Sequence, residues 1–479
     1  MAALCKTRNA VVVTGRFIHE ALSFLVFSIL DAVDFLLCFV FKVADFVMEA
    51  EWKPCYCFSA KEAITSSGKI LVSEQGESKI VCLCSTKLEM EEISDTLYRR
   101  PCILSELSKS TVKELKRITV DKTVVQSNRE TFRKGASQSV PRFILNSSLV
   151  GTIQGKKPAG PSRKLTRSWS ECDCQLCTCW AISGEASLFV KVQGPRGKAQ
   201  EDVLFIHGFI SSSTFWTESL FPCFSDAARS AYRLLAVDLL GFGRSPKPTD
   251  SFYTLKDHVD MIERSVLEPH RVKSFHIVAH SLGCILALAL AVKSPGSVKS
   301  LTLLAPPYYP VPKGEQASRY VLSKVAPRKL WPPIAFGSSI ACWYEHISRA
   351  VRLIFCKNHR SWEFFIKLVT MNRIRTFMCE VFWTHTHTAA WHTFHNIICG
   401  TASKLEGYLE AVRDKLKCEV HVIHGEDDEL IPVECSLSVK EKVPRAKVKV
   451  VKKKDHLTIV VGRSDEFAKE LEAIWSSSS

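Results

Sequence analysis

The feature that most constrains the fold is an abrupt change from a strand pattern to a helix pattern around one serine. The apolar run Phe275–Val278 is typical of a buried strand, and the Ala- and Leu-rich run Cys284–Val292 is typical of a helix. Ser281 lies in the turn between them, flanked by small residues, as a strained turn requires. This is the arrangement of a nucleophile elbow, although Ala279 stands where the pattern has its first glycine. We therefore predict that Ser281 is a nucleophile.

A candidate acid follows far downstream, on a loop after another predicted strand. The strand pattern Cys418–Ile423 leads into the polar segment His424–Pro432, which contains Gly425 and ends with a proline. Asp428 lies between these two rigid points, where a carboxylate can orient a histidine. Asp427 is the competing acid.

A candidate base follows the last predicted strand, Lys447–Val451. The loop after it carries Asp455-His456, and a histidine in this place can act as the general base for a serine. The chain order Ser281, Asp428, His456 is one of the known orders of a serine, acid and histidine set. The sequence therefore predicts these three as catalytic residues.

A turn earlier in the chain is the candidate for an oxyanion hole. The predicted strand Asp202–Ile206 ends in His207-Gly208-Phe209. We expect the backbone N–H groups of Phe209 and Leu282 to stabilise a developing negative oxygen, with Gly208 allowing close approach of the backbone. His207 is expected to support the turn rather than carry a proton.

Residues 308–405 show no strand pattern and are rich in aromatic residues, so we expect a helical cap. Its aromatic side chains form either the core of the cap or a roof over a long acyl chain. His385, His387, His392 and His395 are candidate metal ligands, but no carboxylate accompanies them. We predict no metal there and instead a polar helix surface, facing a pocket or solvent.

The N-terminal segment is predicted to be one long apolar helix without Pro or Gly between Gly15 and Pro54. At about 100° per residue its charges fall on one narrow stripe. These charges are Arg16, Glu20, Asp31, Asp34, Lys42, Asp45 and Glu49. Such a helix lies in a membrane interface or spans a membrane with its stripe covered, and a signal anchor or signal peptide is compatible with it. A buried helix of the soluble domain is the alternative.

A basic segment separates this helix from the rest of the chain. Residues Arg99–Arg167 contain 16 Lys and Arg and 4 Asp and Glu, so they carry +12 of the net charge of +15. The segment is polar and has no hydrophobic periodicity. We interpret it as a linker, with attraction to anionic surfaces as the alternative and no nucleic-acid module in view. Asn146 lies in a glycosylation sequon, usable only in a lumenal location. Among the 19 cysteines the tight cluster Cys172–Cys179 lacks the second pair of a zinc site, so disulfides or scattered thiols are expected.

These patterns divide the chain into six segments. They are 1–54, a membrane or signal helix; 55–98, unassigned; 99–170, the linker; 171–307 and 406–479, the two parts of an α/β core; and 308–405, the cap.

The four separated signals resemble the α/β-hydrolase superfamily over roughly residues 185–475. In detail, Trp391–Gly400, Glu429–Cys435 and Asp455–Arg463 resemble the plant Bodyguard family. The resemblance implies a mostly parallel sheet of the eight-stranded type with helices on both faces and a cap inserted after strand 6. It also implies an extracellular or membrane-associated enzyme of the epidermis, described as a probable lysophospholipase needed for cuticle and cutin assembly.

The resulting hypothesis is a serine carboxylic ester hydrolase without a cofactor that acts on lipid-like esters. We expect lysophospholipase-type or cutin-related activity in the secretory pathway, at the cell membrane or in the cell wall. One alternative is an acyltransferase that builds cutin polyester with the same residues. An alternative of another class is a ligand-binding or scaffolding protein that keeps the fold without catalysis.

Overall fold

The computed structural model describes eleven stretches of the chain. They are residues 2–49, 69–74, 77–82, 87–89, 93–97, 169–170, 187–195, 201–248, 251–369, 371 and 376–477. The sequon at Asn146 and the cluster Cys172–Cys179 lie outside them. The chain forms two compact units, one of Met1–Asp34, Glu92–Thr96 and Ser170–Ser479, the other of Phe35–Glu91 and Leu97–Trp169.

The first unit is organised around a seven-stranded sheet in the order β10-β9-β8-β7-β5-β6-β4. All neighbours pair in parallel except β4, which is antiparallel to β6. The strands are β4 (Val190–Gln193), β5 (Glu201–Ile206), β6 (Tyr232–Val237), β7 (Phe275–His280), β8 (Val298–Leu304), β9 (Glu419–Gly425) and β10 (Lys447–Val451). The predicted α/β-hydrolase fold is confirmed. The described sheet has one strand fewer than the eight-stranded type, and the residues just before Ser187 lie outside the described part.

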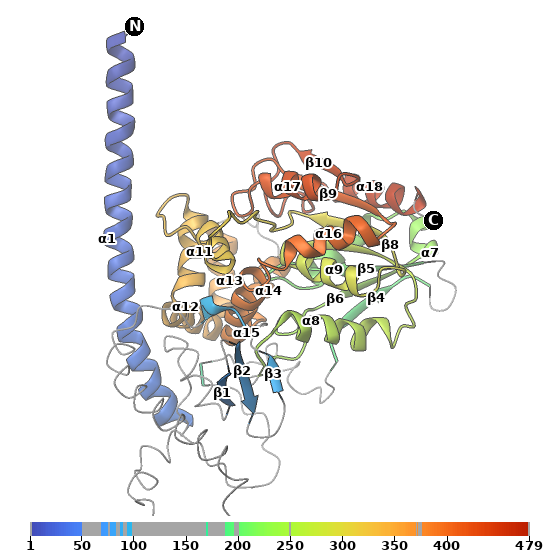
Figure 1. The fold of residues 1–479 in the computed structure, drawn as a ribbon, viewed down its shortest axis with the longest axis horizontal. Helices are drawn as coiled ribbons and strands as arrows, with labels where there is room; N and C mark the ends of the chain where they lie inside the picture. Colours follow the sequence, from blue (N-terminus) through green and yellow to red (C-terminus); the bar gives the residue numbers. More distant parts are fainter. Residues whose placement is uncertain are drawn as a thin grey trace, which may run out of the picture. The chain divides into compact units, whose positions relative to one another are not determined.

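Successive side chains of the strands enter two different cores, because a strand alternates its faces. In β5, Leu204 and Ile206 face one core, and Val203 and Phe205 face the other. Helices cover both faces (Figure 1). The first core takes α8 (Leu255–Ile262), η5 (Glu263–Leu267), α9 (Leu282–Lys293), α16 (Leu405–Lys415) and α17 (Glu434–Lys442). The second takes α6 (Thr214–Thr217), η4 (Phe221–Cys223), α7 (Asp226–Ala231) and α18 (Ser464–Ser477).

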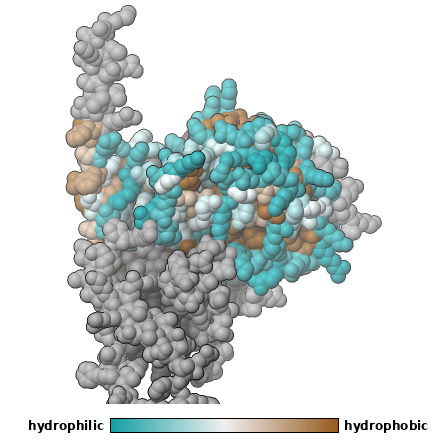
Figure 2. Space-filling view, in the orientation of Figure 1, coloured by the Kyte–Doolittle hydropathy of each residue, from teal (hydrophilic) through white to brown (hydrophobic). Residues whose placement is uncertain are grey.

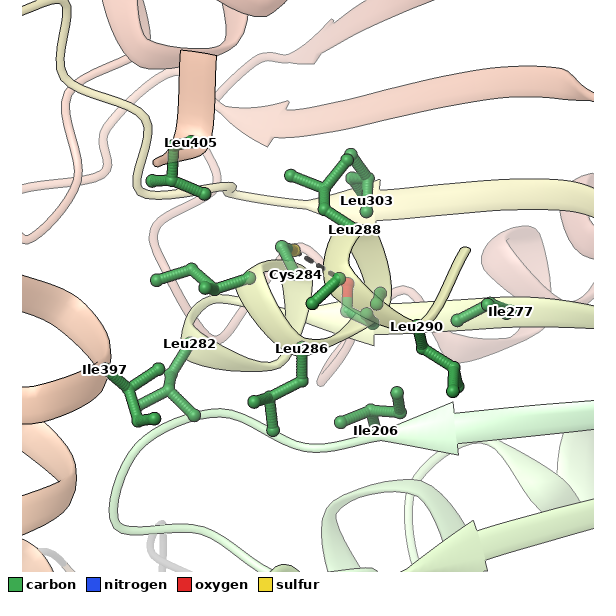
Figure 3. Close-up of a cluster of buried hydrophobic side chains, with 14 of the residues drawn as sticks. Ile206, Ile277, Leu282, Cys284, Leu286, Leu288, Leu290, Leu303, Ile397 and Leu405 are labelled. Atoms are coloured by element: carbon green, nitrogen blue, oxygen red, sulfur yellow. Dashed lines mark hydrogen bonds between the residues drawn. The ribbon is translucent and has the colours of Figure 1, made fainter. Parts of the chain in front are cut away.

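The helix α9, which follows Ser281, is buried on every side. Figure 3 shows its side chains between Ile206, Ile277 and Leu303 of three strands and Ile397 and Leu405 of later segments. Burying one such leucine stabilises the fold by about 1.5–3 kcal/mol. The start of α9, and with it Ser281, is therefore fixed by the centre of the core.

The long insertion between β8 and α16 is helical in its described residues, as predicted, and is called the cap below. Its helices are α10 (Ala317–Val325), α11 (Pro333–Trp343), α12 (Glu345–Lys357), α13 (His359–Val369), α14 (Thr376–Trp383), α15 (His387–Thr393) and η6 (Phe394–Cys399). Its aromatic residues divide into two groups. Trp383 and Trp391 are buried, whereas Trp331, Phe364 and Phe365 are exposed.

The N-terminal helix α1 runs from Ala2 to Glu49 and continues from the first unit into the second. Its part Phe17–Met48 is long and apolar enough to cross a membrane, a property that it shares with signal sequences. The second unit also contains an antiparallel sheet of β1 (Lys69–Glu74), β2 (Glu77–Cys82) and β3 (Lys87–Glu89) within the unassigned segment. The turn η2 (Asp95–Leu97) follows it. The limits of the predicted domains stay a prediction.

Candidate active site

Ser281 occupies a strained turn between β7 and α9. Its φ of 53° and ψ of −122° lie outside the regions that serine ordinarily adopts, and such conformations persist only where the surroundings impose them. Its N–H donates to the carbonyl oxygen of Leu304 at 2.8 Å. A side chain at Gly283 would place Cβ 2.7 Å from the His207 oxygen, so only glycine lets α9 approach β5 this closely. Ala279 is fully buried in β7, where the turn accommodates its methyl group.

The turn after β5 is pressed against this serine. A Cβ atom at Gly208 would lie 3.1 Å from Ser281 Cβ and 2.9 Å from His280 Nδ1. The backbone N–H groups of Phe209 and Leu282 donate to no other group in the described part of the chain. Leu282 is the first residue of α9, where N–H groups have no partner within the helix. Two backbone donors are thus available beside Ser281 for a negatively charged oxygen.

His207 supports this turn through both of its ring nitrogens. Nε2 accepts from the Leu239 N–H at 3.0 Å, so Nδ1 carries the proton and donates to the Gly208 oxygen at 2.7 Å. Burial lowers the pKa of His207, against the opposing effect of Asp238. A neutral histidine with both nitrogens engaged holds the backbone in place and has no nitrogen left for a substrate.

Asp428 and His456 lie together, although 28 residues separate them in the chain. His456 Nδ1 is 2.7 Å from Asp428 Oδ2, and the Asp428 side chain is fully buried. The other oxygen, Oδ1, accepts from the N–H groups of Leu430 and Ile431, both at 2.9 Å. Burial alone would raise the pKa of Asp428, but hydrogen bonds with His424 and His456 lower it well below its usual value. The carboxylate is therefore ionised and holds the imidazole through Nδ1.

The competing acid, Asp427, is exposed, so the geometry singles out Asp428. The serine and the base are connected differently. Ser281 Oγ and His456 share no hydrogen bond in this structure, and the contact between the two loops is made by His280. Such bonds are often long without substrate and tighten when it binds. The structure thus brings Asp428 and His456 together and places the loop of His456 beside the residue that precedes Ser281.

Two positioning histidines were missed by sequence reasoning. His280 Nε2 donates to the His456 oxygen at 2.9 Å, and the two rings lie 4.6 Å apart between centroids. Burial, with the neighbouring His456, lowers the pKa of His280 to about 3, so it is neutral at pH 7. His424 accepts from Ser436 at 2.6 Å and donates to the Ile431 oxygen at 2.8 Å, with its Nε2 3.4 Å from Asp428 Oδ2. Adjacency to Ser281 and to Gly425 was the only sequence signal for either.

Of the two surfaces predicted for the cap histidines, the solvent-facing one is wrong, and the pocket-facing one stays a prediction. All four of His385, His387, His392 and His395 are buried. His392 stacks on Phe252 with centroids 5.8 Å apart, and His395 Nδ1 lies 3.0 Å from Thr96 Oγ1. His395 is buried because η6 winds as a π-helix and packs into the core. Within the described residues no group of three His, Cys, Asp or Glu side chains is arranged to hold a metal.

Five cysteines in the described part of the chain are buried thiols, namely Cys284, Cys379, Cys399, Cys418 and Cys435. For these five, the alternative of scattered thiols holds.

The sheet and the serine turn define the class of protein. The family model of the alpha/beta hydrolase fold matches residues 203–333, and the chain is an α/β hydrolase. Its sequence is 56% identical to the Arabidopsis thaliana "Probable lysophospholipase BODYGUARD 3" over 498 residues, covering 100% of both chains. It is 56% identical to "Probable lysophospholipase BODYGUARD 1" of the same plant, covering 97% of each. A solved structure, MenH of S. aureus, is 18% identical with a TM-score of 0.44, covering 60% of this chain and 98% of that one. The chain belongs to the Bodyguard family.

Proposed function

We propose that this protein is a serine carboxylic ester hydrolase that acts on lipid-like esters. The observation that carries the proposal is the pair formed by the buried Asp428 carboxylate and His456, joined at 2.7 Å, next to the strained turn of Ser281. A serine beside a histidine that a carboxylate orients is the arrangement that activates a hydroxyl for attack on an acyl carbon. The relatives named probable lysophospholipases support a lipid ester as the substrate.

In the proposed mechanism Ser281 Oγ attacks the ester carbonyl while His456 Nε2 takes its proton. The tetrahedral oxyanion receives hydrogen bonds from the N–H groups of Phe209 and Leu282. His456 then returns the proton to the departing alcohol, which leaves an acyl group on Ser281. Water, activated by the same histidine, releases the acid. Asp428 keeps the proton on Nδ1 and stabilises the charged imidazolium throughout.

We propose that the enzyme works at a membrane surface of the secretory pathway or the cell wall. The long apolar helix α1 supports this location. Lipid esters concentrate in such surfaces, and the exposed aromatic residues of the cap lie on the same unit as the active site. A role in cuticle or cutin formation follows from the family resemblance.

The test is product analysis with the purified full-length protein and its Ser281→Ala variant. Each receives a lysophospholipid and a glycerol ester of a hydroxy fatty acid, and products are separated by mass spectrometry. Free fatty acid from the wild type and none from the variant supports hydrolysis. Oligomeric esters in place of free acid would favour the acyltransferase. Binding without any product from either protein would favour the non-catalytic alternative.

A further inference from the structure

The N-terminal helix has two faces within the first unit. Ser23, Phe27 and Asp34 are buried, and at about 100° per residue they fall within a sector of about 40°. On the opposite side lies a stripe of exposed apolar side chains, called the open face below. It consists of Leu22, Leu25, Ile29 and Val33, which are 50%, 56%, 54% and 39% exposed. Figure 2 shows brown, hydrophobic surface on the coloured part of α1.

Asp34 of α1 provides the hydrogen-bond acceptor for the N-terminus of helix α12 in the cap. Its Oδ1 accepts hydrogen bonds from the backbone N–H groups of His346 and Ile347, both at 2.9 Å. These belong to the first turn of α12, whose own N-cap residue, Tyr344, makes no side-chain capping bond. A carboxylate there satisfies N–H groups that the helix cannot and interacts favourably with its dipole. Asp34 therefore performs, from α1, the role that Ser or Asp ordinarily performs at an N-cap.

A second contact lies one turn away. Arg328 Nη2 donates to both carboxylate oxygens of Asp31, at 2.8 and 3.0 Å. Its guanidinium lies over the rings of Phe27, Trp343 and Tyr344 at 5.3, 5.7 and 5.8 Å. The Tyr344 hydroxyl donates to the Phe27 carbonyl at 3.1 Å. Because this ion pair is partly exposed it contributes little alone, and the packed rings supply most of the contact.

These contacts explain why an apolar helix carries aspartates. At the centre of a bilayer, unpaired carboxylates such as those of Asp31 and Asp34 would be unfavourable, and such residues are rare in membrane-spanning helices. Here both are bound by the cap of the same chain. Removal of α1 would leave Arg328 without its carboxylate, two amides of α12 without their acceptor, and Tyr344 and Phe336 without the Phe27 ring between them.

We propose that α1 is retained in the mature protein as a permanent partner of the cap and that its open face lies against a lipid bilayer. The cap surface is complementary to such a partner. Residues 308–405 contain 13 Lys and Arg against 4 Asp and Glu, which favours anionic head groups. Phe364, Phe365 and Leu368 of α13 are 64%, 53% and 63% exposed, and they give this unit a second apolar surface. The side of α1 that carries Asp31 and Asp34 is thus the side that binds protein, and the open face is the side that binds lipid.

Retention is tested on the full chain, expressed with a C-terminal tag in plant secretory cells. Mass spectrometry of the purified protein gives its N-terminus. We expect a chain that still contains residues 17–34. A mature N-terminus beyond Asp34 would overturn the proposal.

The contact with the cap is tested by hydrogen–deuterium exchange at the start of α12. Asp34→Ala removes the acceptor. Loss of an N-terminal capping interaction of this kind should accelerate exchange of the His346 and Ile347 amides by about five- to tenfold. Asp34→Asn keeps an acceptor oxygen, so the exchange rates should increase less than in Asp34→Ala. This variant serves as the test if the alanine variant does not fold. Glu20→Ala is the matched control, since Glu20 is on the same stripe but exposed. Unchanged exchange in Asp34→Ala would refute the contact.

The bilayer is tested with the photoreactive amino acid benzoylphenylalanine in the full chain, in nanodiscs of phosphatidylcholine and phosphatidylserine. We expect the probe at Ile29 to form adducts with lipid and the probe at Phe27 to form adducts with the cap. Cross-links from position 29 to a second copy of the chain would overturn the bilayer as the partner. The absence of lipid adducts at position 29 would do the same. None of these measurements depends on catalytic turnover, so they are independent of the esterase proposal.

Discussion

The substitution Gly208→Ala tests whether the turn after β5 must press against the nucleophile. A methyl group there would lie 2.9 Å from His280 Nδ1 and 3.1 Å from Ser281 Cβ, whereas ordinary contacts begin at 3.4 Å. The turn must therefore move by about 0.3–0.5 Å, and the Phe209 N–H moves with it. Since Gly208 has no positive φ, alanine introduces crowding but no backbone strain at this position.

The expected loss follows from the geometry of oxyanion stabilisation. Removal of one donor reduces kcat by about 100- to 1,000-fold, and a misplacement of about 1 Å can reduce it about 100-fold. A shift of half that size should lower kcat by about 10-fold with KM nearly unchanged, because the bond strengthens in the transition state.

The assay is steady-state hydrolysis of a water-soluble p-nitrophenyl ester, with thermal unfolding as a measure of folding. The matched control is Gly407→Ala in α16, where a methyl group would meet nothing within 4 Å. It should leave kcat unchanged and stabilise the fold by about 0.5–1 kcal/mol. If Gly208→Ala folds normally and retains the wild-type kcat, the turn is no part of the catalytic geometry.

Two further predictions concern the acid and the histidine next to the nucleophile. Asp428→Asn should lower kcat by about 10⁴-fold, because the amide no longer fixes the imidazole tautomer. Asp427→Asn, at the exposed neighbour, should leave kcat unchanged. Equal losses in the two variants would mean that the acid is misassigned. The pKa of His280 is lowered to about 3 in the folded protein. The unfolded histidine, with a pKa near about 6.5, binds a proton that the folded one does not, so this contribution to stability is present above about pH 6.5 and is lost as the pH falls towards the folded value. His280→Gln should therefore reduce the pH dependence of urea unfolding by up to about one proton between about pH 4 and 6, and an unchanged slope would contradict the burial of a neutral imidazole.

The sequence was sufficient to predict the sheet because its strands are buried apolar runs that end at turn-forming residues. Lys447–Val451 is a strand with the predicted limits, and the predicted strand Asp202–Ile206 differs from β5 by one residue. The elbow was recognisable because only small residues fit the turn, and Gly283 indeed has no room for a Cβ atom.

The rest depended on contacts between segments that are distant in the chain. His280 contacts a backbone oxygen 176 residues downstream, and no local pattern encodes such a contact. The stripe of charges on α1 was predicted from helical spacing alone, but the partner of Asp34 lies 312 residues away. The burial of the cap histidines could not be predicted, because the polarity of a helical segment does not indicate which other segments cover it.

Labelling with a serine-directed fluorophosphonate shows whether Ser281 is an activated nucleophile. The full-length protein is labelled and the adduct is located by peptide mass spectrometry. Ser281→Ala removes the proposed nucleophile, and Ser294→Ala at the other end of α9 is the matched control. We predict a single adduct on Ser281 in the wild type and in Ser294→Ala, and none in Ser281→Ala. No adduct on the wild type, or one that persists in Ser281→Ala, would contradict the assignment.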